Sequence, residues 1–164
     1  MNINKIYIFT GAIHSGKTTT LQTWLRNKEL NVGGILAPDV DGARRLYDIA
    51  RNKFHDFEMT TDHPTDDILM VGKYRFSKET FATARDIMLR TIKENPEWMI
   101  VDELGKLELE DEGLEPALTD VINYYKSDEA KGRLILVVRD HLRDNAIDKY
   151  GLSSDMMLHK TFFE

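Results

Sequence analysis

Short apolar runs alternate with amphipathic stretches along much of the chain. Three runs are dominated by apolar residues: 6–10, 98–101 and 134–138. Three longer stretches carry apolar residues at helical spacing: 17–28, 77–94 and 114–125. Uninterrupted apolar runs are typical of strands buried on both faces of a sheet. The alternation therefore predicts an α/β fold, in which helices cover both faces of a mainly parallel sheet.

A different pattern fills residues 32–60. Three short segments there are separated by the turn-forming pairs Asp41-Gly42 and Asn52-Lys53. Strands joined by such tight turns form a meander, so we expect a β-hairpin insert. The three segments are 32–40, 45–51 and 54–60. The other expected elements are a loop at 61–67, a strand at 71–76, a short helix at 141–150 and a last strand at 156–159.

A glycine-rich segment lies between the first predicted strand and the first predicted helix. Residues 11–18 match the pattern G-x-x-x-x-G-K-[ST] in the strand–loop–helix context that this motif requires. In such a loop, backbone N–H groups and the helix N-terminus face a triphosphate. Lys17 is then expected to reach the β and γ phosphates as a catalytic cation, and Thr18 to bind Mg²⁺. The expected nucleotide-binding residues are Gly11, Ala12, Ile13, His14, Ser15, Gly16, Lys17, Thr18 and Thr19.

Two of these positions have roles that the motif does not specify. His14 occupies a variable position of the loop, where the backbone alone normally contacts phosphate, so we expect no catalytic role for its side chain. Thr19 lies at the helix start, where its hydroxyl either caps a backbone N–H or approaches the α phosphate. Capping is the preferred interpretation.

Asp102 and Glu103 follow directly after the apolar run at 98–101. Ligands bind at the carboxyl ends of parallel strands, so both carboxylates should face the phosphate loop. We expect Asp102 to hold Mg²⁺, through water, and Glu103 to orient and deprotonate an attacking water molecule. Paired acids opposite a phosphate loop indicate hydrolysis of a nucleoside triphosphate.

Phosphoryl transfer also requires a cation close to the γ phosphate. Arg139 follows the run at 134–138 and should leave the sheet at the same edge as Asp102, so we predict it as a catalytic residue. A surface ion pair with Asp140 or Asp144 fits the sequence equally well. Arg143, one helical turn on, and Lys106 are weaker candidates.

The chain resembles the thermophile-type, or cancer-related, nucleoside-triphosphatase family. The resemblance lies in the phosphate loop, in Gly33-Gly34-Ile35 and above all in the sequence Val-Asp-Glu-Leu-Gly-Lys-Leu-Glu-Leu at 101–109. Residues 71–74 extend it over most of the chain. It implies a three-layer, RecA-like P-loop NTPase fold with a hairpin insert. It also implies slow hydrolysis of nucleoside triphosphates with broad base tolerance.

By position, the resemblance assigns the phosphate and Mg²⁺ roles to Lys17 and Thr18, the metal role to Asp102 and the general base to Glu103. The sequence departs from the family pattern at 40–45, where a basic residue is expected soon after the second strand and Asp41 stands instead. Arg44 and Arg45 follow this turn. Both are candidates to reach phosphate, but the preferred interpretation is that they are solvated turn residues.

Composition narrows the function further. The chain has 164 residues, enough for a single domain spanning 1–164. Its 22 Lys and Arg against 28 Asp and Glu argue against a broad nucleic-acid-binding face. There is no cysteine, which excludes a thiol nucleophile. No apolar stretch reaches the roughly 20 residues of a membrane span, and no signal-peptide pattern is present, so we expect a cytoplasmic protein. The sequence specifies no protein partner.

Two other functions would use the same phosphate loop. A small-molecule or nucleotide kinase needs an acceptor site and usually a mobile lid rich in arginine, which the sequence does not show. A nucleotide-binding switch or adaptor would use the hairpin insert as a docking edge. Hydrolysis remains the leading prediction, and the preferred base is not specified.

Overall fold

The computed structural model describes residues 4–11, 15–26, 29–59 and 67–164, and its main feature is a mixed sheet. Within these ranges, eight strands form this sheet, and five of them run parallel in the order β10, β1, β9, β8, β2. Antiparallel β4 pairs with β2, and β3 and β5 pair with β4. The bounds are β1 Ile6–Gly11, β2 Val32–Leu36, β3 Asp39–Val40, β4 Ala43–Asp48, β5 Lys53–Asp56, β8 Trp98–Leu104, β9 Arg133–Arg139 and β10 Met157–Leu158.

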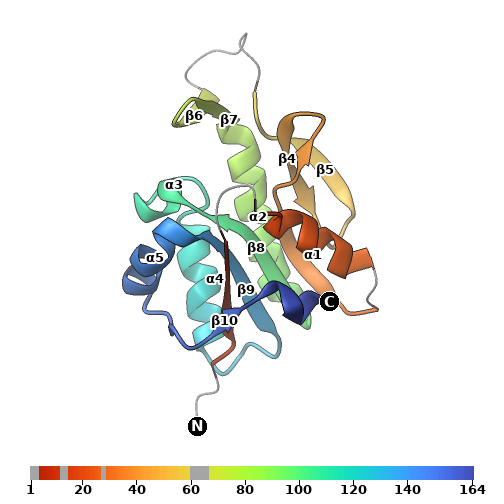
Figure 1. Ribbon diagram of the computed structural model, residues 1–164, viewed down its shortest axis with the longest axis vertical. Helices are drawn as coiled ribbons and strands as arrows, with labels where there is room; N and C mark the ends of the chain where they lie inside the picture. Colours follow the sequence, from red (N-terminus) through yellow and green to blue (C-terminus); the bar gives the residue numbers. More distant parts are fainter. Residues whose placement is uncertain (1–3, 12–14, 27–28, 60–66) are drawn as a thin grey trace.

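Helices lie on both faces of this sheet (Figure 1). On one face, α1 packs with the C-terminal 3₁₀ turn, and on the other lie α2, α4 and α5. No helix in the described ranges is both long and apolar enough to cross a membrane. The bounds are α1 Lys17–Arg26, α2 Lys78–Glu94, α3 Lys106–Leu109, α4 Ala117–Lys126 and α5 Arg143–Tyr150, with 3₁₀ turns η2 Asp140–Leu142 and η3 Lys160–Phe163.

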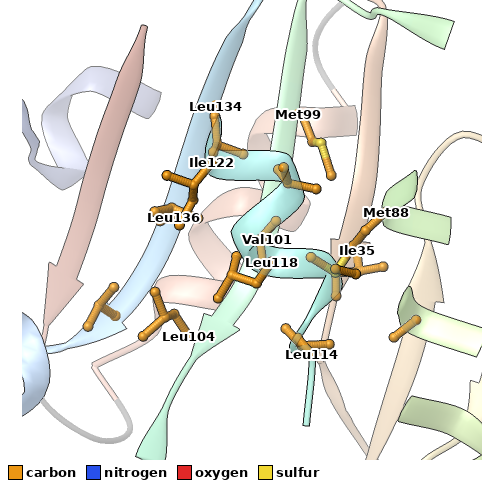
Figure 2. Close-up of a cluster of buried hydrophobic side chains, with 14 of the residues drawn as sticks. Ile35, Met88, Met99, Val101, Leu104, Leu114, Leu118, Ile122, Leu134 and Leu136 are labelled. Carbon is orange, nitrogen blue, oxygen red and sulfur yellow. The ribbon is translucent and has the colours of Figure 1, made fainter. Parts of the chain in front are cut away.

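Strand β8 shows why the sheet is covered on both sides. Its side chains alternate between two hydrophobic clusters: Met99 and Val101 join the cluster under α2 and α4, while Trp98 and Ile100 join the one under α1. Successive side chains of a strand point to opposite faces, so an unbroken apolar run buries both. Figure 2 shows Val101 beside Leu118 of α4. The predicted three-layer α/β arrangement is confirmed.

Helix α2 begins and ends at the predicted positions. The Ser77 hydroxyl accepts the N–H of Thr80 at 3.1 Å, and Glu79 lies in the first turn. Both features stabilise a helix N-terminus, where backbone N–H groups lack partners and the dipole favours negative charge. The helix ends at Asn95, whose φ of 51° is in the left-handed region, and Pro96 follows.

The region around the hairpins differs from the prediction in two places. The expected strand at 71–76 is a hairpin of two strands, β6 (Ile68–Val71) and β7 (Tyr74–Ser77), which turn at Gly72 with a φ of 59° and form a sheet of their own. The expected segment 32–40 is divided, because β2 ends before Pro38 and belongs to the parallel sheet, whereas β3 pairs with β4. The predicted loop at 61–67 lies outside the described residues except for Asp67.

Candidate active site

The strand order brings the predicted chemical groups to one edge of the sheet. Strand β9 lies between β1 and β8, with Gly11 opposite Arg139 and Asp102 opposite Val137. All three strands are parallel, so their carboxyl ends meet at the same edge. The phosphate loop after β1, Arg139 at the end of β9 and the acidic pair of β8 therefore lie side by side.

The described part of the phosphate loop is tightly closed around Lys17. A Cβ on Gly11 would lie 2.4 Å from Ser15 Oγ, so a larger residue there would force the Ser15 side chain to move. Gly16 has a φ of 84°, in the left-handed region that favours glycine. The buried Lys17 ammonium donates to the Gly11 carbonyl at 3.0 Å. Burial lowers the pKa of Lys17, and the charges of Glu103 and Asp102 oppose this. The predicted contacts of Ala12, Ile13 and His14 lie outside the described residues.

Asp102 joins the phosphate loop to the acidic strand. The Thr18 hydroxyl donates to Asp102 Oδ2 at 2.8 Å, and the N–H of Ala37 donates to the same oxygen at 3.1 Å. A hydroxyl and a carboxylate this close are hard oxygen donors of the kind Mg²⁺ takes, together with phosphates and water. The described ranges contain no cluster of three or more His, Asp or Glu that could bind a metal alone. The residues present therefore fit a metal ion shared with a bound phosphate.

Glu103 pairs with Arg139, at 3.2 Å between Oε1 and the guanidinium Nε. Burial, and then the charge of Asp102, raise the pKa of Glu103, and the charges of Arg139, Arg44 and Lys17 oppose this. A carboxylate with a raised pKa is a better proton acceptor than an exposed one. The sequence allowed Arg139 to lie beside the acidic pair or to form a surface ion pair with Asp140 or Asp144. In the structure it lies beside the acidic pair. Asp144 pairs instead with exposed Arg143, at 3.2 Å.

Strand β8 is irregular where it carries the acidic pair. Asp102 pairs with Val137 and Leu104 with Val138, so the register shifts across Glu103, and the Asp102–Glu103 peptide bond is cis. In a regular strand, consecutive side chains point to opposite faces. A bulge changes the direction of a side chain. The register shift is therefore consistent with the placement of these neighbouring carboxylates, of which Asp102 contacts Thr18 and Glu103 contacts Arg139.

Lys17, Thr18, Glu103 and Arg139 line a cavity of about 150 Å³. One residue that lines this cavity, Arg44, was not expected there from the sequence. Arg44 was expected to be solvated, but it is half-buried, lines the cavity and donates from Nη1 to the Ala37 carbonyl at 2.9 Å. Lys106, a weaker cation candidate, is exposed and does not line the described wall. The lining residues are Ser15, Gly16, Lys17, Thr18, Thr19, Gln22, Ala37, Pro38, Asp39, Arg44, Glu103 and Arg139.

A model of the NTPase family matches residues 5–161, which is nearly the whole chain. The chain belongs to this NTPase family. Its structure is similar to that of THEP1 from the hyperthermophile Aquifex aeolicus, with a TM-score of 0.70 and 18% identity over 94% of this chain and 88% of that one. It is also similar to the solution structure of a human cancer-related nucleoside triphosphatase, with a TM-score of 0.60 and 17% identity over 88% and 84%. No curated protein matches the sequence.

The family match confirms the resemblance drawn from the phosphate loop and the acidic segment, and it makes the protein a nucleoside triphosphatase. At 17–18% identity the two solved structures show the fold alone. The roles of individual residues in this NTPase stay proposals.

Behind the acidic pair of this NTPase, a buried carboxylate closes the segment 105–114. Glu108 Oε1 accepts the N–H of Gly105 at 2.8 Å, and Oε2 accepts the N–H of Leu114 at 2.9 Å. Burial raises the pKa of Glu108 to about 7, although the two backbone hydrogen bonds oppose the shift. Glu108 thus binds both ends of the segment that leaves β8.

We expect the free energy of unfolding to fall as the pH rises from about 4.5 to about 7. Over this range the folded protein keeps the proton of Glu108, which the unfolded chain releases near pH 4.5. The full effect is about 3 kcal/mol. Denaturant unfolding of the wild type and of Glu108→Gln at pH 5, 6, 7 and 8 measures this effect. The contributions of the other carboxylates are the same in both proteins and cancel in the difference between their free energies of unfolding. Parallel curves for the two proteins would contradict this assignment.

Proposed function

We propose that this NTPase hydrolyses nucleoside triphosphates to nucleoside diphosphate and orthophosphate in a Mg²⁺-dependent reaction at this cavity. The observation that carries the proposal is the 2.8 Å hydrogen bond between Thr18 and Asp102, with Glu103 next in the chain. This contact joins a loop suited to bind phosphates to a strand that carries a proton acceptor. The two halves of a phosphoryl-transfer site are therefore in contact.

In this proposal, the phosphate loop and Lys17 bind the triphosphate, and Thr18 and Asp102 would hold Mg²⁺. The metal ion, when bound, supplies charge neutralisation at the β and γ phosphates. Glu103 orients a water molecule whose oxygen bonds to the γ phosphorus, while the bond to the β,γ-bridging oxygen breaks. The proton of the water passes to the Glu103 carboxylate, and the products are nucleoside diphosphate and orthophosphate.

Arg139 supplies a cation on the same side as the proton acceptor. Its 3.2 Å ion pair with Glu103 keeps the guanidinium at the cavity, where it can contact the γ phosphate. Positive charge in a partly buried site stabilises the charge that the transferred group carries in the transition state. We therefore propose Arg139 as the cis-acting arginine of the reaction.

Broad base tolerance is supported by the size and lining of the cavity. Its volume of about 150 Å³ is below the roughly 300–1,000 Å³ of pockets that enclose whole small ligands. No aromatic residue is among the lining residues of the described ranges, so nothing there offers a stacking surface for a base. The cavity fits a phosphate chain better than a whole nucleotide. The expected slow rate depends on the family resemblance alone.

Phosphate release from ATP, GTP, CTP and UTP tests this function. With Mg²⁺ and no added acceptor, we expect all four to be hydrolysed at rates within about tenfold of one another, and we expect EDTA to abolish the activity. Candidate acceptors are then added. Phosphate transfer only when an acceptor is present would instead identify a kinase. No turnover, combined with nucleotide-dependent binding of a protein, would identify a switch.

A further inference from the structure

The cavity is lined by a second arginine, Arg44, which comes from a strand distant from the phosphate loop. From β1 the sheet continues through β9, β8 and β2 to β4, which carries Arg44. Figure 1 shows β4 on the side of β8 away from β9. Lys17 and Arg44 nevertheless line the same cavity. A phosphate chain that the loop holds in this cavity therefore lies in a space that Arg44 also lines.

Several contacts hold Arg44 in this position. Its backbone is fixed on both sides by Glu58: the Arg44 N–H donates to Glu58 Oε1 at 3.2 Å, and the Glu58 N–H donates to the Arg44 carbonyl at 3.0 Å. Its guanidinium donates to the carbonyl of Ala37, whose own N–H donates to Asp102. One residue, Ala37, thus connects Arg44 to the proposed metal ligand.

The guanidinium of Arg44 has donors to offer to a ligand. An arginine carries five N–H donors in a planar fork that matches two phosphate oxygens. Among the described residues, the guanidinium forms one hydrogen bond, to the Ala37 carbonyl, and no ion pair within 4 Å. Asp39 is its cross-strand neighbour but is exposed and forms no such pair with it in these ranges. The charge of Arg44 does act on Glu103, because it opposes part of the upward shift in the pKa of that carboxyl group.

We propose that Arg44 is a second catalytic arginine, which contacts the γ-phosphoryl group from the side opposite the phosphate loop. This inference rests on the proposed hydrolysis. While the water oxygen bonds to phosphorus and the bridging bond breaks, negative charge is distributed over the three equatorial oxygens. Lys17 and Arg139 face this group from one side, and Arg44 donates to it from the other. A nucleoside diphosphate lacks the group and gains nothing from Arg44.

The neighbouring residue provides a matched control. Arg45 points away from the cavity: it pairs with Asp56 at 3.5 Å, and its guanidinium lies 5.2 Å from the Phe54 ring centre. Arg44→Ala and Arg45→Ala remove the same charge from adjacent positions of one strand. A general effect of charge or of strand β4 would appear in both variants. An effect at the γ-phosphoryl group would appear only in Arg44→Ala.

The test combines kinetics with binding in Mg²⁺. For Arg44→Ala we expect kcat to fall by about 10²–10³-fold, as for loss of one transition-state donor. Affinity for a non-hydrolysable triphosphate should also fall, while affinity for the diphosphate stays within about twofold of the wild type. Arg45→Ala should match the wild type in all three measurements. Arg44→Lys should recover part of kcat, because lysine restores the charge but not the bidentate fork.

Three results would overturn the role of Arg44. The first is a kcat of Arg44→Ala within about threefold of that of Arg45→Ala. The second is an equal loss of diphosphate and triphosphate affinity, and the third is a lowered melting temperature that accounts for the loss. If the wild-type protein itself releases no phosphate, the proposed function fails instead. The comparison of triphosphate with diphosphate binding then still tests the contact of Arg44 with the γ phosphate.

Discussion

Glu103→Gln is expected to lower kcat by about 10²–10⁴-fold, which is the usual contribution of a positioned general base. Glutamine keeps the length of the side chain and an oxygen that can accept from Arg139, which lies 3.2 Å from Glu103 in the wild type. It cannot accept the proton of the attacking water. Binding of Mg²⁺ and a non-hydrolysable triphosphate should therefore stay near the wild-type level.

Steady-state phosphate release and calorimetric binding separate these two quantities for Glu103→Gln. Glu97→Gln is a suitable control, because Glu97 is exposed and lies just before β8, at the opposite end of the strand from the cavity. Its kcat should equal that of the wild type. Wild-type turnover by Glu103→Gln would remove the proposed proton acceptor, and a lost affinity for the triphosphate would show that Glu103 acts in binding.

Lys17→Ala is expected to lower kcat/KM by about 10³-fold, through both weaker triphosphate binding and slower turnover. Its ammonium is buried at the cavity, close enough to Asp102 and Glu103 for their charges to act on its pKa. Loss of one preorganised donor at a developing charge costs about 10²–10³-fold in kcat alone. The lost contact with the β phosphate adds to this in KM.

Two comparisons make the Lys17 experiment specific. Lys17→Met keeps most of the apolar stem and should be as inactive as Lys17→Ala, because the charge is what matters. Lys131→Ala removes an exposed lysine from the loop before β9 and should leave kcat/KM unchanged. Thermal melting shows whether each variant is folded. A folded Lys17→Met protein with turnover within tenfold of the wild type would contradict the role of Lys17.

The layered fold could be predicted from sequence because its strands are apolar on both faces. The runs at 98–101 and 134–138 have no polar position that could face solvent, so they must be covered on both sides. Helix α2 had a capping serine, an acidic first turn and a following proline, which together define both ends. These signals are local, and the structure follows them closely.

The antiparallel parts depend on pairing between distant residues, and there the local signals were insufficient. The turn at Gly72 lies inside the segment 71–76, which the sequence indicated as one strand. The antiparallel pairing of β6 with β7 makes this region a hairpin instead. The four-residue helix α3 is too short for a periodic pattern. In both cases an element too short to give a sequence pattern of its own was missed.

In the candidate site too, the residues placed by local signals were predicted, and the residue placed by pairing between distant strands was not. Lys17, Thr18, Asp102, Glu103 and Arg139 were expected together, because a motif and the ends of parallel strands both have positions that the topology fixes. Arg44 was misinterpreted because its place depends on how β4 folds back along β2. Two arginines after a turn resemble a solvated pair, and only their alternation along the strand separates the residue at the cavity from its neighbour.

The most direct test of the account is a structure of the protein with Mg²⁺ and a non-hydrolysable triphosphate. We expect the β and γ phosphates to lie against Lys17, Thr18 and Asp102 to hold the metal ion, and Glu103 to face the γ phosphorus. A triphosphate bound elsewhere, or a triphosphate in the loop from which both carboxylates point away, would contradict the proposed function.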